Sequence, residues 1–434
     1  MGKYLAHQEY KNSGVKWLGK IPGHWSLKKL KFICRVKTGD KDTVMAVEDG
    51  EYPFFVRSQI VERINSVGAD CEAVLTAGDG VGVGKVFHYY DGKFDFHQRV
   101  YMLNDFSNVL GKFVYYYLSN NFYKVALEGN AKSTVDSLRL PQFLNFEFSL
   151  PEVNEQQKIA NFLDHETAKI DTLIEKQQQL IKLLKEKRQA VISHAVTKGL
   201  NPNAPMRDSG VEWLGEVPEY WTVCRIKQVA KMESGHTPDK KKEEYWVNCD
   251  IPWVSLNDSS QLKEVDYISD TAFSLNEKGV ENSSARKLPA RCVVFTRDAS
   301  IGLSAITTRE MAVSQHIIAW VCDPDKVIPE YLLLVFYAMK NELERYAFGA
   351  TLKTIGMPDV NKLTGAFPSL DEQCHIAESV FAKVKKFDML VSKNEQVVNV
   401  VRERRTALIS AAVTGKIDVR NWQAPATSEV EATK

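Results

Sequence analysis

The stretch SGVKWLGKIPGHW at residues 13–25 returns almost intact as SGVEWLGEVPEYW at residues 209–221. When residues 13–31 are aligned with residues 209–227 without a gap, nine of nineteen positions are identical. Self-similarity of this strength indicates an internal repeat, and a repeat governs the architecture of a chain before any local motif does.

A second, longer repeat begins at Pro151 with PEVNEQQKIANFLDHETAKID and at Pro368 with PSLDEQCHIAESVFAKVKKFD. The first pair of segments is offset by 196 residues and the second pair by 217, so the second copy holds 21 additional residues between them. The two repeated segments of each copy, which we call its frame, therefore enclose a stretch of sequence that resembles its counterpart in the other copy only loosely. This organisation predicts a pseudo-two-fold internal repeat.

The longer repeat predicts two long helices, because apolar residues recur at spacings of three and four from Ile170 and from Phe387. We expect Asn154 and Asp371 to act as N-caps and Gly199 and Gly415 to stop the helices. Heptad lettering gives the seam Ile170, Leu173, Gln177, Leu180, Leu184, Phe387, Leu390, Asn394, Val397 and Val401. The shared register favours two helices that pack on each other, and the alternative is that each packs only on its own domain.

The enclosed segments predict two compact mixed domains, each with a curved sheet. Short β-prone runs such as YPFFV, GKVFHYY, RVYML, RCVVFT and QHIIAWV alternate with turns that contain glycine or aspartate. One helix is expected after the strands of each domain, over residues 109–127 and 328–348. The repeated tryptophans Trp17, Trp25, Trp213 and Trp221 are interpreted as core anchors of the frame.

The length of 434 residues exceeds what a single hydrophobic core fills. We predict a first domain at 1–150, a helix and linker at 151–205, a second domain at 206–367, a helix at 368–416 and a flexible tail at 417–434. The longest apolar run, YLLLVFYAM at 331–339, is too short to cross a membrane, and the widely spaced cysteines fit reduced thiols in a cytoplasm. The net charge of +1 means that any DNA binding must depend on local patches or on a partner.

Motifs of known chemistry are incomplete in this sequence. The segment GDGVGVGKVF at 78–87 lacks the first glycine and the hydroxyl of a phosphate-binding loop, so it is interpreted as a glycine-rich turn between strands. HETAK at 165–169 lacks the second histidine of a zinc protease, and no Pro-Pro pair supplies an amino-methyltransferase loop. Asp91-Gly92-Lys93 has no assignable second carboxylate. We therefore expect no catalytic residues and no metal site.

The repeated segments together resemble the specificity subunit of type I restriction-modification systems. The resemblance rests on the SGVxWLGxxPxxW openings, on the EQxxIA helices, and on SGHTP (234–238), IPWVSLNDS (251–259) and VVFTRDASIG (293–302). It implies an α+β chain with two globular target recognition domains joined by two long helices that form an antiparallel coiled coil. It covers nearly the whole chain.

The resemblance also implies a function. Each domain would read one half of a bipartite, asymmetric site in double-stranded DNA, and the helices would set the spacing and bind the methyltransferase subunits. Restriction subunits would dock on that assembly. S-adenosylmethionine and ATP are expected only in these partner subunits, so the chain itself would need no cofactor.

Candidate DNA-contacting residues follow from base chemistry, since Arg and Lys suit guanine and Asn and Gln suit adenine. In the first domain they are Lys37, Arg57, Ser58, Gln59, Lys85, Arg99 and Lys132. In the second they are His236, Thr237, Lys240, Lys241, Asn257, Arg297, Ser300 and Lys353. The alternative function is a two-headed coiled-coil scaffold that binds proteins instead of DNA.

Overall fold

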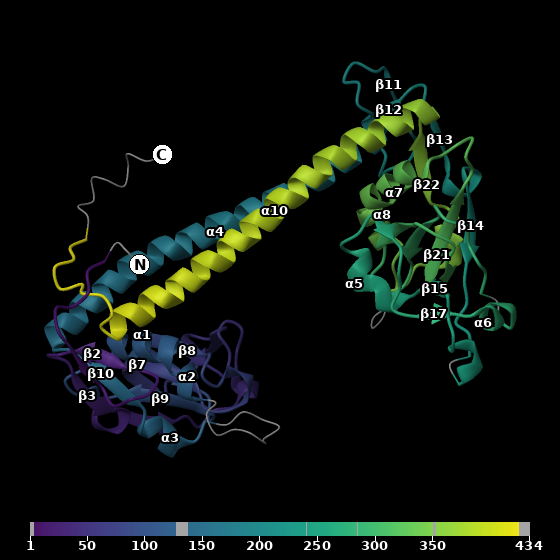
Figure 1. The fold of residues 1–434 in the computed structure, drawn as a ribbon. Helices are drawn as coiled ribbons and strands as arrows, with labels where there is room; N and C mark the ends of the chain where they lie inside the picture. The colour runs from purple at the N-terminus through teal and green to yellow at the C-terminus, as the bar shows by residue number, and fades with distance from the viewer. Residues whose placement is uncertain (1–3, 127–137, 240, 284, 350–352, 425–434) are drawn as a thin grey trace. The chain divides into compact units, whose positions relative to one another are not determined.

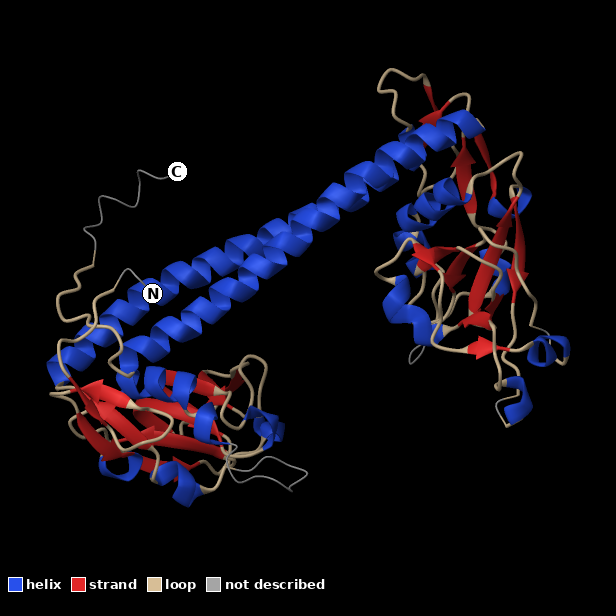
Figure 2. Cartoon of the chain, in the orientation of Figure 1, coloured by secondary structure: helices blue, strands red, loops and turns tan. Residues whose placement is uncertain are grey.

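The computed structural model of the protein describes residues 4–126, 138–239, 241–283, 285–349 and 353–424 (Figure 1). Its contacts divide the chain into two units, one formed by Met1–Gln178 with Gln396–Lys434 and the other by Gln179–Glu395. Two long helices, α4 (Val153–Lys198) and α10 (Leu370–Val413), contribute one half each to both units. Each unit thus combines a mixed globular domain with a pair of helix halves (Figure 2).

The first unit is built on a six-stranded sheet with the order β4-β9-β7-β8-β5-β6. The strands of this domain are β1 (Tyr10–Asn12), β2 (Lys20–Pro22), β3 (Ser26–Lys29), β4 (Arg35–Thr38), β5 (Tyr52–Phe55), β6 (Glu62–Ile64), β7 (Ala69–Ala77), β8 (Phe87–Phe96), β9 (Val100–Asn104) and β10 (Glu147–Leu150). The short helices are η1 (Leu30–Phe32), η2 (Thr43–Met45), η3 (Gly80–Gly82), α1 (Gly111–Asn121), α2 (Tyr123–Ala126) and α3 (Leu140–Leu144).

Strand β7 was not predicted from the sequence, because its first half carries Asp70 and Glu72, which have low strand propensity. Its second half, from Ala73 to Ala77, is fully buried and pairs with both β8 and β9. The segment at 78–87 is a glycine-rich turn that contains η3 between β7 and β8, as predicted. The expected helix at 109–127 is divided into α1 and α2.

The second unit contains a five-stranded sheet with the order β14-β21-β18-β19-β16 and a three-stranded sheet with the order β17-β15-β20. Its strands are β11 (Met206–Asp208), β12 (Glu216–Pro218), β13 (Thr222–Arg225), β14 (Ala230–Ser234), β15 (Ile251–Val254), β16 (Tyr267–Ile268), β17 (Ser274–Leu275), β18 (Val293–Thr296), β19 (Ser304–Thr307), β20 (Ala312–Val313), β21 (Ile317–Cys322) and β22 (Thr364–Phe367). Its short helices are η4 (Ile226–Gln228), η5 (Glu243–Tyr245), η6 (Leu256–Asp258), α5 (Ser259–Leu262), α6 (Glu277–Glu281), α7 (Pro329–Ala338), α8 (Lys340–Arg345) and α9 (Met357–Val360).

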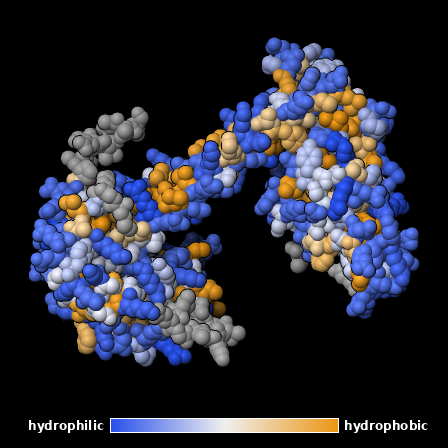
Figure 3. Space-filling model, in the orientation of Figure 1, coloured by the Kyte–Doolittle hydropathy of each residue, from blue (hydrophilic) through white to orange (hydrophobic). Residues whose placement is uncertain are grey.

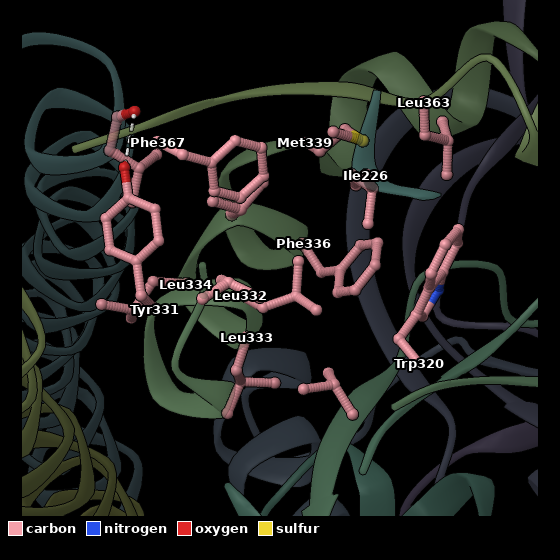
Figure 4. Close-up of a cluster of buried hydrophobic side chains, with 14 of the residues drawn as sticks. Ile226, Trp320, Tyr331, Leu332, Leu333, Leu334, Phe336, Met339, Leu363 and Phe367 are labelled. Atoms are coloured by element: carbon pink, nitrogen blue, oxygen red, sulfur yellow. Dashed lines mark hydrogen bonds between the residues drawn. The ribbon is translucent and has the colours of Figure 1, made fainter. Parts of the chain in front are cut away.

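Helix α7 fills the core of the second domain. Its residues from Tyr331 to Phe336 are all buried, and they meet Trp320 of β21 and Phe367 of β22 (Figure 4). The hydroxyl of Tyr331 donates a 2.8 Å hydrogen bond to the backbone oxygen of Ala366, so this buried polar atom is satisfied. The expected helix at 328–348 is interrupted at Met339, between α7 and α8.

The repeated frames have the same pairing in both domains. β1 pairs with β2 as β11 pairs with β12, and β3 pairs with β10 as β13 pairs with β22. Trp25 and Trp221 are at most 1% exposed, and Trp17 and Trp213 pack against the edges of the same cores. The prediction that these tryptophans anchor the frame is confirmed.

Both long helices begin two residues earlier than N-caps at Asn154 and Asp371 predict, at Val153 and Leu370. Asn154 and Asp371 lie inside the first turn, so the prediction that they act as N-caps is wrong. At their other ends Gly199 and Gly415 adopt φ of 73° and 72°, a left-handed conformation that glycine takes without strain. These two glycines end the helices as predicted.

Within each unit the two helix halves run antiparallel and pack on each other. In the second unit Arg188 Nε lies 2.8 Å from Asp388 Oδ1, and Lys185 Nζ lies 3.2 Å from Glu395 Oε1. In the first unit Arg405 binds Asp171 through two nitrogens, with distances of 2.8 and 3.1 Å. The two helices therefore pack on each other in both units, and the alternative that each helix packs only on its own domain is wrong.

The buried stripe of this pair differs from the heptad assignment at four positions. Leu173, Leu180, Leu390 and Val397 are 41–42% exposed. The following residues Ile174, Ile181, Val391 and Val398 are less exposed, and Val391 and Val398 are buried. The buried stripe therefore consists of Ile174, Ile181, Val391 and Val398 together with the six remaining predicted seam residues. Those six are all half-buried: Ile170, Gln177, Leu184, Phe387, Asn394 and Val401.

The end of the chain completes the core of the first domain. Ile409 and Val413 of α10 are buried among Trp25 and Phe162, and Ile417 and Val419 beyond the helix join the same cluster. The backbone nitrogen of Asp418 donates a 2.7 Å hydrogen bond to the oxygen of Leu5. The prediction of a flexible tail from residue 417 is therefore wrong for residues 417–419, because they carry apolar side chains that this core buries.

Candidate nucleic-acid interface

Three loops converge in the first domain through backbone hydrogen bonds. The nitrogen of Gly78, after β7, donates to the oxygen of Arg99, before β9, at 2.8 Å. The nitrogen of His97 donates to Phe55 at the end of β5, and the nitrogen of Leu138 donates to Gly78, both at 2.9 Å. The polar residues on these loops are thereby held together although they lie far apart in sequence.

The second domain repeats this arrangement bond for bond. The nitrogen of Arg297 donates to the oxygen of His316 at 3.0 Å, Ser314 donates to Val254 at 2.9 Å, and Ile355 donates to Arg297 at 2.9 Å. The parallel pairs Phe55–Phe96 and Val254–Val313 fix the same register in both domains. It follows that Asp79 is equivalent to Asp298, and Arg99 to His316.

A further loop joins each cluster at a glycine. A Cβ atom at Gly39 would overlap the backbone oxygen of Phe96, and one at Gly235 would overlap that of Val313. Only glycine lets the loops after β4 and β14 pass so close to these strands. The nitrogen of Gln98 then donates to the oxygen of Lys41 at 2.8 Å, which places Lys41 beside the cluster.

Asp79 is the centre of the first cluster. Its Oδ1 lies 2.8 Å from Arg57 Nη1, and its Oδ2 lies 2.8 Å from Arg99 Nη1. The side chains of Arg57 and Arg99 remain 39% and 58% exposed. One carboxylate therefore orients two arginines and leaves most of their donors available to a ligand.

The other predicted residues of the first domain divide into two groups. Gln59 Nε2 donates to the oxygen of Lys85 at 3.1 Å, and the oxygen of Ser58 lies 2.9 Å from His88 Nε2, so these loops belong to the cluster. Lys37 is exposed on β4 near Cys71, and among the described residues no hydrogen bond or ion pair joins it to the cluster. Lys132 lies outside the described residues.

Asp298 is the centre of the second cluster. Its Oδ2 lies 2.5 Å from His316 Nδ1 and 3.6 Å from Arg297 Nε, and Thr354 Oγ1 donates to its other oxygen. The carboxylate is 7% exposed, whereas the imidazole is 35% exposed. The backbone geometry matches that of the first cluster, but the side chains differ: His316 replaces Arg99, and Arg297, at the position of Gly78, is the arginine near the carboxylate.

Other predicted residues border this second cluster. The oxygen of Lys353 accepts a hydrogen bond from Ala299 at 2.8 Å, next to Ser300, and the Lys353 side chain is exposed. His236 and Thr237 follow Gly235, and Trp253 Nε1 donates to the oxygen of His236 at 3.2 Å. Asn257 is exposed on η6.

Lys241 is exposed, and its nitrogen donates to Asp239 Oδ1 at 3.0 Å. Lys240 lies outside the described residues.

Sequence reasoning missed four residues of these clusters: Lys41, Gln98, Gln315 and His316. Gln98 and Gln315 are exposed at equivalent positions, immediately before Arg99 and His316. The shared signal was a glutamine followed by a basic or imidazole side chain at the start of a β-prone run. Glutamine, arginine, asparagine and lysine are the side chains that read base edges in the major groove.

The helices present a second type of surface. Large apolar side chains on α4 and α10 are exposed. In Figure 3 they appear as orange patches along the two helices, among mostly hydrophilic residues. They are Leu173, Leu180, Leu183, Met389, Leu390, Val397 and Val400. Exposed apolar side chains that recur on one element favour contact with another protein. In the described parts of the chain, no helix is long and apolar enough to span a bilayer.

Comparison with known proteins gives consistent matches. The sequence profile of the type I restriction modification DNA specificity domain matches residues 22–183 and 218–399. The chain is 30% identical over 231 residues to the type I restriction enzyme EcoDI specificity subunit of Escherichia coli, an alignment that covers 50% of this chain and 51% of that protein. It is 22% identical over 438 residues to the MjaVIII specificity subunit of Methanocaldococcus jannaschii, covering 95% and 98% of the two chains.

The fold also matches a solved structure. A chain from a structure described as the basis of complex assembly and conformational transition of the type I R-M system superposes with a TM-score of 0.68. It is 13% identical in sequence, and the match covers 92% of this chain and 99% of that one. The chain thus spans about half the length of the EcoDI relative and nearly all of the MjaVIII relative.

Proposed function

The chain belongs to the family of type I restriction-modification DNA specificity domains, and from this premise we propose that it is the DNA sequence-recognition subunit of a type I restriction-modification complex. Each domain reads one half of a bipartite, asymmetric DNA site. The helices set the distance between the half-sites and bind the methyltransferase subunits, on which the restriction subunits assemble.

The observation that carries this proposal is the pair of equivalent loop clusters. The same backbone hydrogen bonds hold the loops in both domains, but the side chains differ, with Arg57 and Arg99 around Asp79 in one and Arg297 and His316 around Asp298 in the other. Two domains with the same backbone arrangement but different contact residues are suited to reading two different DNA half-sites. A protein-binding scaffold would not require two arginines pre-oriented by one carboxylate, as Asp79 orients Arg57 and Arg99.

The exposed apolar side chains of α4 and α10 support the second part of the proposal. A near-neutral net charge of +1 supplies little general affinity for phosphates, so partner subunits that bind the helices would add phosphate contacts. Methylation with S-adenosylmethionine and ATP-dependent cleavage belong to those partners, and this chain is not catalytic.

The test is to map methylated adenines in DNA exposed to the full chain assembled with its methyltransferase subunit. Arg99→Gln is expected to weaken or relax recognition in one half-site, since a good base contact discriminates by about 1–3 kcal/mol. His316→Ala is expected to act on the other half-site. Arg35→Gln is the matched control, because Arg35 is exposed at the far end of β4, 3.6 Å from Asp105.

Two results would contradict the proposal. One is that Arg99→Gln and His316→Ala alter the same half-site or leave the methylated sequence unchanged. The other is that the assembled complex has no affinity for DNA that falls with salt concentration, which would favour the scaffold function instead.

A further inference from the structure

Three potential metal ligands meet in the first domain although they are far apart in sequence. His24 Nε2 lies 2.8 Å from Glu155 Oε2, and His7 Nε2 lies 4.0 Å from Glu155 Oε1. One ligand atom from each of the three residues lies within 4.8 Å of the others. They come from the N-terminal segment, from the loop after β2 and from the first turn of α4, so no local spacing in the sequence indicates them.

His7 is the unusual member of this group. The residue is 6% exposed, and neither of its ring nitrogens has a hydrogen-bond partner among the described residues. A buried polar group without a partner costs about 1–3 kcal/mol, so such groups are rare in folded proteins. The Nε2 atom faces Glu155, and Nδ1 faces Asp418 Oδ2 at 3.8 Å.

The surrounding groups orient these side chains as the outer shell of a metal site does. Trp25 Nε1 donates a 3.1 Å hydrogen bond to Glu155 Oε1, which fixes the carboxylate. Asp418 stands behind His7 on the side away from Glu155 and is itself held by two hydrogen bonds from Arg420, at 3.0 and 2.6 Å. A histidine that binds a metal through one nitrogen and faces a carboxylate with the other is the common arrangement at zinc sites.

We propose that His7, His24 and Glu155 bind a divalent transition-metal ion, with Zn²⁺ preferred. Two imidazoles and one carboxylate are a donor set that suits Zn²⁺, and a water completes the tetrahedron. Bonds of about 2.0–2.2 Å place tetrahedral ligand atoms roughly 3.4 Å apart. The present separations need only small movements, and the His24 side chain, which is 42% exposed, is free to make them.

The second copy of the repeat provides a natural comparison. Glu372 occupies the position of Glu155, but Tyr220 replaces His24 and Asn203 replaces His7. The Tyr220 hydroxyl donates a 3.1 Å hydrogen bond to Glu372 Oε1. The carboxylate is thus present in both copies, whereas both imidazoles are present in only one, so the second copy should not bind the ion.

The ion would act as a structural link. It would join the N-terminal segment and the first repeat to the start of α4, next to the C-terminal segment that carries Asp418. Metal sites of this kind contribute directly to folding stability because the unfolded chain does not preform them.

The test uses the full chain, stripped with a chelator and titrated with Zn²⁺ in competition with a chromophoric chelator. We expect one ion per chain, and Co²⁺ in the same site should give the visible absorption of tetrahedral coordination. His24→Tyr and His7→Asn, which install the residues of the second copy, should each lower the affinity more than about 100-fold, beyond the 10- to 100-fold typical of outer-shell changes. Glu372→Gln is the control and should leave binding unchanged.

His24→Tyr replaces an exposed side chain with the residue that the second copy accommodates, so it should fold, and circular dichroism checks this. Asp418→Asn should lower the affinity by about 10- to 100-fold. Binding of Zn²⁺ with equal affinity by the wild-type chain and by His24→Tyr would show an adventitious ion and overturn the proposal. Failure of the wild-type chain to bind one equivalent would overturn it as well.

Discussion

Gln373 ties the start of α10 to the second domain, and its replacement by leucine should loosen that connection. Its side chain is fully buried, accepts a 3.0 Å hydrogen bond from the nitrogen of Ile328, and donates to the oxygens of Lys326 and Pro368 at 2.8 and 2.9 Å. Gln373→Leu leaves these three backbone groups without their side-chain partner in a buried or partly buried position. At about 1–3 kcal/mol each, with the low end for carbonyls, the loss is about 3–6 kcal/mol.

The buried leucine offsets about 1–2 kcal/mol of this loss, so the net destabilisation is about 1–5 kcal/mol. Hydrogen exchange measured by mass spectrometry on the full chain shows which amides are affected. Amides in the first turns of α7 and α10 should exchange about 5- to 4000-fold faster, since each 1.4 kcal/mol is a factor of ten.

Gln156 makes the equivalent contacts in the first domain, with Leu110, Asn108 and Pro151. Gln156→Leu should therefore accelerate exchange in α1 and at the start of α4 by a similar factor. Gln157→Leu is the control, because this neighbouring side chain is exposed and bonds only to Asn161 in its own helix. Equal exchange rates in Gln373→Leu and the wild type would refute the reasoning.

Three further changes test the helices and the second domain. Gln177→Leu should raise the free energy of unfolding by about 1–2 kcal/mol in urea denaturation, because Gln177 Oε1 is buried and has no hydrogen-bond partner within the described parts of the chain. Asp171→Asn should lower it by no more than about 1 kcal/mol, and less at high salt, since the pair with Arg405 is half exposed. Hydrogen bonding from Lys231 lowers the pKa of Glu233, so its carboxylate stabilises the fold above the unfolded pKa of about 4.3 and loses this effect as pH falls. Glu233→Gln should flatten the dependence of thermal stability on pH in that acidic range.

The helix pair shows what a repeat can and cannot predict. The two long helices and the glycines that end them follow from sequence, because helical spacing and the left-handed preference of glycine are local properties. The inner stripe does not, because leucine or valine precedes an apolar residue at each ambiguous turn, as in Leu173-Ile174 and Val397-Val398. Only contact with the other helix decides which of the two is buried.

The loop clusters were only partly predictable for a related reason. Base-reading chemistry selects Arg57 and Arg99, but it also selects Lys37, which lies elsewhere on the sheet. The registers of β8 and of β9 against β7 place Gln98 in the cluster, and those registers depend on long-range pairing. His7 and His24 were missed as potential ligands because they approach Glu155 only after the chain folds.

Helix α10 supplies Ile409 and Val413 to the core of the first domain, around Trp25, and Ile417 and Val419 follow them. While the ribosome is still extending the chain, this domain therefore emerges with an unfilled interior and cannot mature until residue 419 has been synthesised. Apolar residues of an incomplete domain are prone to aggregate, and here they stay unpaired while the whole second domain is made. Loss of residues 409–419 would thus damage the domain whose sequence begins the chain.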